Sequence, residues 1–249
     1  MISLKTPGEI DIIARAGAII SALYREIPGR LAPGVSTREL DRFAESFIRD
    51  HAGAEPAFKG LYGFPATLCT SINHEVVHGI PSDKRKLVNG DIVSVDCGVK
   101  LDGFYADAAV TLPVGEILPE VTRLLEVTRE ALNRGIMQAH PGNRLGDIGA
   151  AIQHPADEAG YGIVRELVGH GVGREPHEEP QVPNYGKAGR GMPLEIGLVL
   201  AIEPMFNLGT ANVRTLSDRW TVVTVDRAVS AHFEHTVAVT ASGPRILTQ

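Results

Sequence analysis

Asp96 and Asp107, close together in the chain, are the first residues whose type and spacing suggest chemistry. They flank a tight-turn signal, Leu-Asp-Gly at 101–103, between two apolar segments with the composition of strands. A hairpin with the first two of these turn residues as its loop would place Asp96 opposite Asp107. A loop made of the last two would place it opposite Ala109. Both registers put the two carboxylates on one face of the sheet, because side chains alternate with period two.

Two like charges on one face of a hairpin repel each other, and their removal from water costs further free energy. A shared proton, a buried Lys or Arg, or a metal ion would compensate for both effects. The alternative is that one aspartate belongs to a turn and the other is solvated at a sheet edge. The hairpin alone leaves both interpretations open.

Three further polar residues stand next to apolar segments. His170 follows one of them within a glycine-rich stretch, and His177 comes seven residues later. Glu203 ends an apolar strand and precedes a proline that favours extended backbone, and Glu234 lies at the approach to the last strand. Each has an ordinary alternative: a hydrogen-bonded structural histidine, a charge at the exit to solvent, or an edge-strand charge that deters aggregation.

Composition restricts the class of protein. The 249 residues are 43% hydrophobic, enough for a sizeable core, and the net charge of -6 argues against a nucleic-acid groove or an anionic-membrane patch. Cys69 and Cys97 are too few for a disulfide framework or a cysteine zinc site. No signal peptide or membrane-spanning apolar run is evident. We therefore expect a cytoplasmic globular protein that binds neither nucleic acid nor membrane.

Periodicity predicts the elements that must position these residues. Capping boxes at Thr6–Glu9 and Ser36–Glu39 predict two helix starts. Further helices are predicted at 116–139 and 144–158, and Pro155 should kink or shorten the second. Residues 56–81 should be mostly loop and short strand. The predicted strands are 91–95, 108–112, 163–168, 198–202, 221–225 and 235–240.

A weak internal echo suggests duplication. The sequence Ala-Pro-Gly at 32–34 precedes the second predicted helix, and His-Pro-Gly at 140–142 precedes the fourth, 108 residues later. A period this long favours two related halves with a joint active site over a solenoid. No linker separates them, so we predict a single domain, 1–249, with pseudo-repeats of about 1–115 and 116–249.

In this order and spacing, the candidate residues resemble the metallo-aminopeptidases of the creatinase-like "pita-bread" fold, above all the type I methionine aminopeptidases. The resemblance covers essentially the whole chain and implies an α+β fold: two pseudo-symmetric halves with a central curved antiparallel sheet covered by helices. The motifs that carry it, besides the Asp96 hairpin, are Ser71-Ile72-Asn73, His78-Gly79-Ile80-Pro81, His170 through Pro180, Ala201-Ile202-Glu203-Pro204, Trp220-Thr221 and Phe233-Glu234-His235-Thr236.

The resemblance implies two divalent metal ions. Asp107 and Glu234 would bridge them, Asp96 would chelate one, and His170 and Glu203 would bind the other. Four carboxylates and a neutral imidazole would balance two divalent cations, which removes the repulsion within the hairpin. Oxygen-rich ligation favours Mn, Fe or Co over a thiolate-type zinc site, although the identity among Co, Mn, Fe, Zn and Ni is left open.

The resemblance also implies roles in catalysis and in substrate binding. Glu203 would shuttle a proton from the attacking water to the leaving amine, His177 would donate to the carbonyl oxygen, and His78 would contact the scissile amide. The alternative for the two histidines is an ordinary role in a surface loop. Besides these histidines, a methionine pocket would be lined by Phe58, Leu61, Phe64, Cys69, Pro176 and Trp220, whose apolar walls suit a thioether.

Some positions depart from the family pattern or leave little trace in sequence. Pro176, Leu61 and Phe58 stand where the family often has an aromatic residue, a tyrosine and a cysteine, which affects the shape of the pocket rather than its apolar character. The family can also bind a monovalent cation through backbone carbonyls. The matching positions are Asn73, Glu75 and Ser230.

The predicted function is removal of the initiator methionine from nascent polypeptides with a small second residue, by a monomer that can meet its substrates at the ribosome. One alternative is an Xaa-Pro aminopeptidase of the same fold, but those enzymes have a long extra N-terminal domain, and here the first helix should begin near residue 6. The other alternative is a non-catalytic binding module, in which metal ligands are lost. All five ligand positions are filled here, which favours an enzyme.

Overall fold

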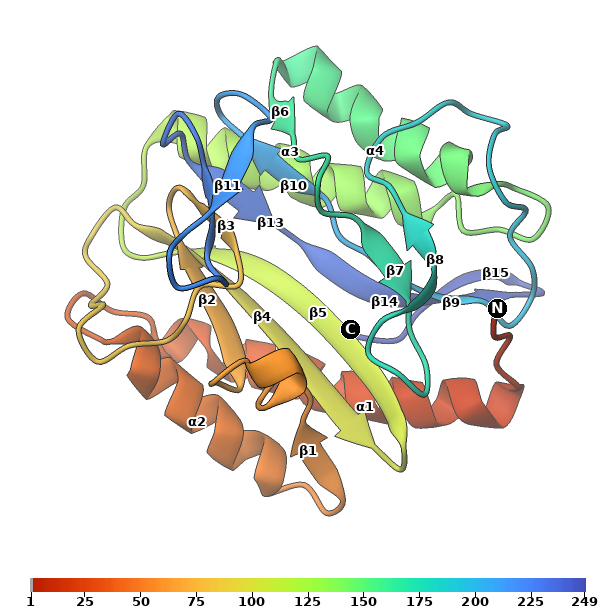
Figure 1. Ribbon diagram of the computed structural model, residues 1–249, viewed down its shortest axis with the longest axis horizontal. Coiled ribbons are helices and arrows are strands. Elements are labelled where there is room, and N and C mark those ends of the chain that lie inside the picture. Colours follow the sequence, from red (N-terminus) through yellow and green to blue (C-terminus); the bar gives the residue numbers. More distant parts are fainter. Residues whose placement is uncertain (1) are drawn as a thin grey trace.

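The structure is a computed structural model, and it describes residues 2–249 (Figure 1). The helices are α1 (Pro7–Glu26), α2 (Thr37–Arg49), α3 (Pro119–Ile136) and α4 (Leu145–Ala159), with two short 3-10 helices, η1 (Pro28–Arg30) and η2 (Leu61–Gly63). The strands are β1 (Ala54–Pro56), β2 (Leu68–Ile72), β3 (Glu75–Val77), β4 (Ile92–Leu101), β5 (Phe104–Pro113), β6 (Gly162–Ile163), β7 (Gly169–Gly171), β8 (Glu178–Val182), β9 (Val199–Ile202), β10 (Met205–Asn207), β11 (Val213–Thr215), β12 (Val222–Thr224), β13 (Ser230–His232), β14 (Glu234–Thr240) and β15 (Gly243–Ile246).

A curved antiparallel sheet forms the centre of the molecule (Figure 1). Its main path runs β1-β4-β5-β14-β9-β7-β8, with β2 added beside β4 and β15 beside β14. Two three-stranded sheets, β13-β10-β6 and β11-β12-β3, lie at its margin. Strands that are far apart in the chain, such as β5 and β14, therefore become neighbours.

The long β4–β5 hairpin settles the register left open by the sequence. Leu101 pairs with Phe104, so Asp102 and Gly103 form the loop, with φ angles of 48° and 82°. Positive φ at both loop residues is the backbone of a type I′ turn, whose twist matches the strands. Asp96 consequently faces Ala109, and Asp107 is its diagonal neighbour on the same face.

Both helix starts at capping boxes agree with the sequence analysis, one strand prediction was wrong, and of the two effects expected of Pro155 the shortening does not occur, while the kink stays a prediction. Both capping boxes form, at Thr6 and at Ser36. Helix α4 continues past the buried Pro155 to Ala159, so the proline does not shorten it. The segment 163–168 is not one strand, because pairing ends at Ile163 and the chain bends through exposed polar residues before β7 begins.

Two of the four hydrophobic clusters in the core lie where the helices cover the sheet. Helices α1 and α2 pack with β4 and β5, where Val95 and Cys97 are buried. Helices α3 and α4 pack with β9 and β14 around Leu200 and Val237. Because side chains alternate along β4, Asp96 must point to the opposite face from Val95 and Cys97. That opposite face carries the candidate site.

Matched contacts connect the two parts of the chain that the sequence echo relates. The Gly34 amide donates to the Leu87 carbonyl at 2.8 Å, and the Gly142 amide donates to the Leu194 carbonyl at 3.2 Å. Helices α2 and α4 begin shortly after these two glycines. Such contacts are what two related halves would show, and the duplication itself stays a prediction. Within residues 2–249, no helix has the length and apolarity needed to cross a membrane.

Candidate metal centre and substrate pocket

Five adjacent strands each bring one predicted ligand residue to the same place on the sheet. In the order of the strands, these residues are Asp96 on β4, Asp107 on β5, Glu234 on β14, Glu203 at the end of β9 and His170 on β7. The register explains the convergence. Ala109 pairs with Asp96 on one side and with Glu234 on the other, so these three side chains form a row across the sheet.

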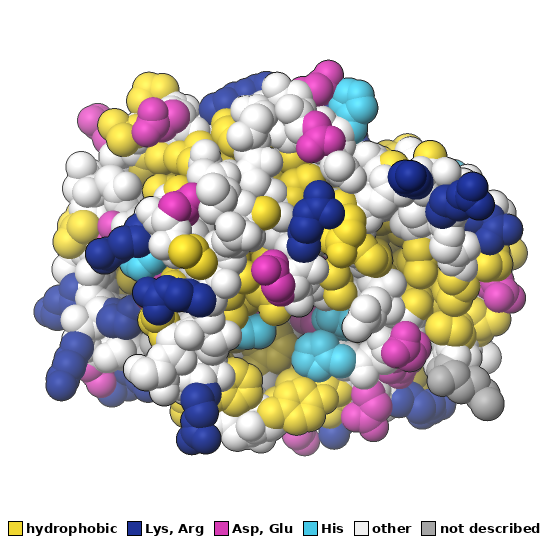
Figure 2. All heavy atoms as spheres, turned by 45° about the horizontal axis from the view of Figure 1, so that its top comes forward, with side chains coloured by type: hydrophobic (Ala, Val, Ile, Leu, Met, Phe, Trp, Pro, Cys, Tyr) yellow, Lys and Arg dark blue, Asp and Glu magenta, His cyan; other side chains and the backbone are white. Residues whose placement is uncertain are grey.

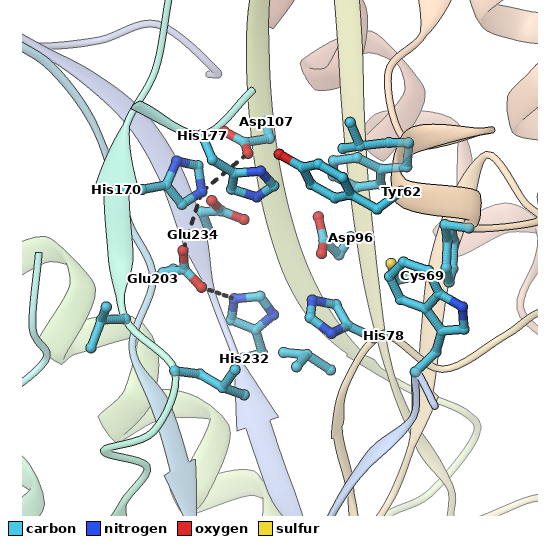
Figure 3. A pocket seen from close by; sticks show the side chains of 17 residues that line it. Tyr62, Cys69, His78, Asp96, Asp107, His170, His177, Glu203, His232 and Glu234 are labelled. Carbon is cyan, nitrogen blue, oxygen red and sulfur yellow. Dashed lines mark ion pairs between the residues drawn. The ribbon is translucent and has the colours of Figure 1, made fainter. Parts of the chain in front are cut away.

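The other side of the site follows from the pairing of β9. Ile202 pairs with His235, which puts Glu203 beside Glu234, and Ala201 pairs with His170. His170 Nε2 lies 3.6 Å from Asp107 Oδ2 and 3.5 Å from Glu203 Oε1 (Figure 3). Asp107, His170 and Glu234 each offer a ligand atom, and these atoms all lie within 4.8 Å of one another. A single ion can therefore contact groups from three strands.

Neighbouring groups fix the orientation of these side chains. The Thr236 hydroxyl accepts from the Asp107 amide at 3.1 Å and lies 3.2 Å from Asp107 Oδ1. His170 Nδ1 lies 2.9 Å from the Gly171 carbonyl, which can only accept, so Nδ1 carries the proton. The lone pair of Nε2 is thereby directed at the carboxylates, as a metal-binding imidazole requires.

The carboxylates of the site are electrostatically unfavourable without a cation. Burial raises the pKa of Asp96 well above its ordinary value, and the nearby Asp107 raises it further. Burial is also the main cause of the raised pKa of Glu203 and of Glu234, with Asp107 as the largest neighbouring charge in both cases. Such shifts mean that the buried anionic forms are destabilised by desolvation and mutual repulsion.

The donor set fits divalent metal ions. No Lys or Arg between residues 2 and 249 forms an ion pair with any of the four carboxylates. Asp96 Oδ1 is buried without a hydrogen-bond partner, which is rare for a carboxylate oxygen. Four acidic groups and one imidazole with a free Nε2 lone pair match the ligand preferences of hard and borderline divalent ions.

An apolar cavity of about 320 Å³ adjoins the acidic cluster. Figure 2 shows a hollow with hydrophobic walls and histidine side chains at its opening. Phe64 and Trp220 meet edge to face in its wall at 5.1 Å between ring centroids. The predicted pocket residues that line the cavity are Phe58, Leu61, Phe64, Cys69, His78, His177 and Trp220. Pro176 is buried next to His177 but lies outside the lining.

The two predicted catalytic histidines stand on either side of the cavity. Burial lowers the pKa of His78 to about 4, and the nearby His177 contributes to the shift. Burial likewise lowers the pKa of His177, with His170 as a further cause, since the two rings lie 4.5 Å apart. Both imidazoles are therefore neutral at neutral pH, and each keeps one N–H donor. His78 has a φ of 60°, a strained value that tends to occur at functional sites.

The three residues predicted for a monovalent cation lie close together. Asn73 has a φ of 54°, and its carbonyl accepts from the Ser230 amide at 2.9 Å. The Glu75 carboxylate accepts from the Ile72 amide and pairs with Arg85, so the side chain of Glu75 is engaged elsewhere. The cation site stays a prediction.

Five cavity residues escaped the sequence analysis: Val77, Leu167, Val168, His232 and Tyr62. His232 is buried in the wall beside Glu203, and Tyr62 stands at the mouth with 76% of its surface exposed. The Tyr62 ring stacks against His177 at 6.1 Å and its φ is 50°. A histidine two residues before Glu234 was the available signal, because period-two alternation puts both on one face. Tyr62 left no such signal.

A family model and several relatives match this geometry. The model of metallopeptidase family M24 matches residues 11–241. The chain belongs to metallopeptidase family M24. A curated relative, the methionine aminopeptidase of Clostridium perfringens, is 52% identical over 248 residues, which span 100% of this chain and 99% of that protein.

Solved structures show the same architecture. The crystal structure of methionine aminopeptidase from Rickettsia prowazekii has a TM-score of 0.97 at 42% identity and covers 100% of both chains. Prolidase from Pyrococcus furiosus has a TM-score of 0.80 at 26% identity, over 99% of this chain and 65% of that one. These structural neighbours confirm the predicted α+β pita-bread fold.

Proposed function

We propose that the protein is a metal-dependent aminopeptidase that removes the N-terminal methionine from nascent polypeptides with a small second residue. The observation that carries this proposal is the convergence of four buried carboxylates and one imidazole, without a Lys or Arg partner in the described chain, at the end of an apolar pocket. The relatives named methionine aminopeptidase, which match over the full length of the chain, support it.

Asp96, Asp107, His170, Glu203 and Glu234 would hold two divalent ions. When bound, such ions supply Lewis-acid activation of water and of a carbonyl group. Asp107 stands between β4 and β14, and we assign it and Glu234 to both ions. Asp96 would contact one ion, and His170 and Glu203 the other. The free Nε2 lone pair of His170 supports its assignment.

The remaining roles belong to side chains around the cavity. Glu203 accepts the proton of the attacking water and passes it to the leaving amine, because a carboxylate at the end of the cavity can take up a proton on one side of the reaction and release it on the other. His177, at the mouth, donates its N–H to the carbonyl oxygen as negative charge develops there. His78, on the opposite wall, donates to the nitrogen side of the scissile amide. In the neutral state each imidazole keeps one N–H that it can donate.

The methionine side chain would occupy the apolar end of the cavity. Phe58, Phe64 and Cys69 belong to one buried cluster, and Leu61 and Trp220 pack against it. A thioether packs well against ring edges, and Phe64 and Trp220 present both an edge and a face. Burial raises the pKa of the Cys69 thiol well above its ordinary value, so it contributes an uncharged wall.

The proposal includes the setting of the reaction. We assign the protein to the cytoplasm, as a monomer that meets nascent chains near the ribosome. A monovalent cation at the backbone of Asn73, Glu75 and Ser230 would hold β3 against β13, because these residues join the two strands.

The test is substrate preference. Chelator-treated protein would be reloaded with Mn²⁺ or Co²⁺ and incubated with Met-Ala-Ser and with an Xaa-Pro peptide, and the released amino acids would be quantified. We expect free methionine from Met-Ala-Ser only after metal is restored. Preference for the Xaa-Pro peptide would replace the proposal by the prolidase-type activity of the same fold.

A further inference from the structure

The histidine that sequence analysis missed, His232, is an unpaired polar group inside the cavity. Its side chain is 2% exposed, and neither ring nitrogen has a hydrogen-bond partner within residues 2–249. A buried N–H or ring nitrogen without a partner is unfavourable, because its hydrogen bonds to water are lost and not replaced. Buried polar groups nearly always have a partner, so the groups that face this imidazole across the cavity are candidates for one.

The position of His232 is tightly determined. On β13 it pairs with Met205 of β10. The His232 amide donates to the Thr111 hydroxyl at 2.9 Å. The same hydroxyl donates to the His232 carbonyl at 2.7 Å. Thr111 in turn contacts the Ser94 hydroxyl at 2.8 Å. Because the backbone is anchored on both sides, the imidazole is held facing the cavity.

His232 lies between Glu203 and His78 in the cavity wall, and of these two its Nε2 is directed at Glu203 (Figure 3). His232 Nε2 lies 3.8 Å from Glu203 Oε2, whereas His170 Nε2 lies 3.5 Å from Oε1. The two imidazoles thus stand at different oxygens of one carboxylate. A separation of 3.8 Å is too long for a hydrogen bond, so the contact requires the two side chains to move closer together. Asn184 holds only the Glu203 backbone, through its carbonyl at 3.0 Å.

We propose that His232 is a positioning residue for Glu203. Its Nε2–H donates to Oε2 in the working enzyme and prevents the carboxylate from rotating, so that the proton acceptor keeps its direction towards the reacting water. A neutral imidazole carries one N–H, and the role requires that this proton be on Nε2. This inference rests on the proposed function, because it assigns Glu203 the proton transfer described above.

The test combines two substitutions with two backgrounds. His232→Leu removes the N–H, and His232→Gln restores a donor on a side chain of similar reach. We expect His232→Leu to lower kcat about 10-fold, at the low end for partners that orient a ligand, with KM within about twofold. His232→Gln should recover kcat to within about threefold. In a Glu203→Gln background, where no carboxylate remains to be positioned, His232→Leu should change kcat by less than about twofold.

Controls separate positioning from folding. Melting temperature and bound metal would be measured for each variant. His51→Leu serves as a matched control, because His51 lies away from the cavity: its Nδ1 is 2.8 Å from the carbonyl of Phe47, a residue of α2 on the helix side of the sheet. Unchanged kcat in a folded, metal-loaded His232→Leu variant would overturn the inference. An equal loss of kcat in the wild-type and Glu203→Gln backgrounds would also overturn it.

A second readout does not need catalysis. Nitrogen-15 NMR of metal-free protein labelled at histidine reports which ring nitrogen of His232 carries the proton. We expect the Nε2–H form, with a signal that moves in Glu203→Gln. The Nδ1–H form would overturn the inference even in a protein that releases methionine. Absence of methionine release would instead contradict the proposed function and leave the NMR result interpretable by itself.

Discussion

Replacement of Lys5 by Met should destabilise the protein far more than its place near the chain end suggests. The Lys5 side chain is 2% exposed, and its ammonium donates to Glu178 Oε2 at 2.5 Å and to the Ser3 carbonyl at 2.8 Å. The other oxygen of Glu178 accepts from the Arg174 amide at 2.7 Å and from the Glu175 amide at 3.3 Å. This ion pair therefore attaches the N-terminal segment to the loop before His177.

The magnitude follows from burial. Removing one partner of a buried ion pair costs about 3–5 kcal/mol, because the other charge is left uncompensated. Glu178 is 13% exposed and keeps its two backbone donors, so we take the lower end, about 3 kcal/mol. For a chain of this size, about 2–4 °C per kcal/mol converts that loss to a fall in melting temperature of about 6–12 °C. The kcat/KM for Met-Ala-Ser should fall too, since the His177 loop loses a support.

The assay is thermal unfolding followed by circular dichroism, with Arg15→Met as the matched control. Arg15 pairs with Asp102 at 3.0 Å, but these side chains are 60% and 51% exposed. Exposed pairs contribute less than about 1 kcal/mol, so the control should lose no more than about 2–4 °C. Glu178→Gln should cost less in the Lys5→Met background than in the wild type. Equal melting temperatures of Lys5→Met and Arg15→Met would refute the reasoning.

Two further predictions concern the metal centre and the pocket. Asp96, Glu203 and Glu234 have raised pKa values in the folded, metal-free protein. Their protonated forms therefore stabilise the folded state fully at a pH below their unfolded-state pKa values near 4, and this stabilisation is lost as the pH rises through their folded-state pKa values. Added Mn²⁺ should therefore raise the melting temperature more at about pH 8 than at about pH 5.5, and an equal gain in calorimetry would contradict this. Gly98→Ala would place a Cβ 2.6 Å from Phe58 Cε1, so the ring must move into the cavity. Steady-state kinetics should show KM for Met-Ala-Ser raised roughly fivefold or more with little change in Mn²⁺ affinity, and an unchanged KM would count against the assigned pocket.

The sequence predicted those features that depend on local rules. Period-two alternation put Asp96 and Asp107 on one face under either turn, and the structure agrees. The choice between the turns depends on the positive φ angles at Asp102 and Gly103, which composition alone does not determine. The strand predicted at 163–168 failed because a short apolar run does not reveal where pairing ends.

Long-range features needed more than periodicity. The adjacency of β5, β14, β9 and β7 brings together residues more than 100 positions apart, and spacing alone gives no such order. The family resemblance supplied the grouping of Asp107, His170 and Glu234, whose roles stay predictions. The contact of Lys5 with Glu178, 173 residues away, and the unpaired state of His232 became visible only in the structure.

Metal stoichiometry in Asp107→Ala tests the central claim most directly. Isothermal titration of metal-free protein with Mn²⁺, followed by methionine release from Met-Ala-Ser in the same sample, measures binding and activity together. The account predicts two equivalents in the wild type, as expected of a two-metal hydrolase, and loss of both the metal pair and the activity in the variant. An Asp107→Ala protein that still binds two equivalents and releases methionine at the wild-type rate would contradict it.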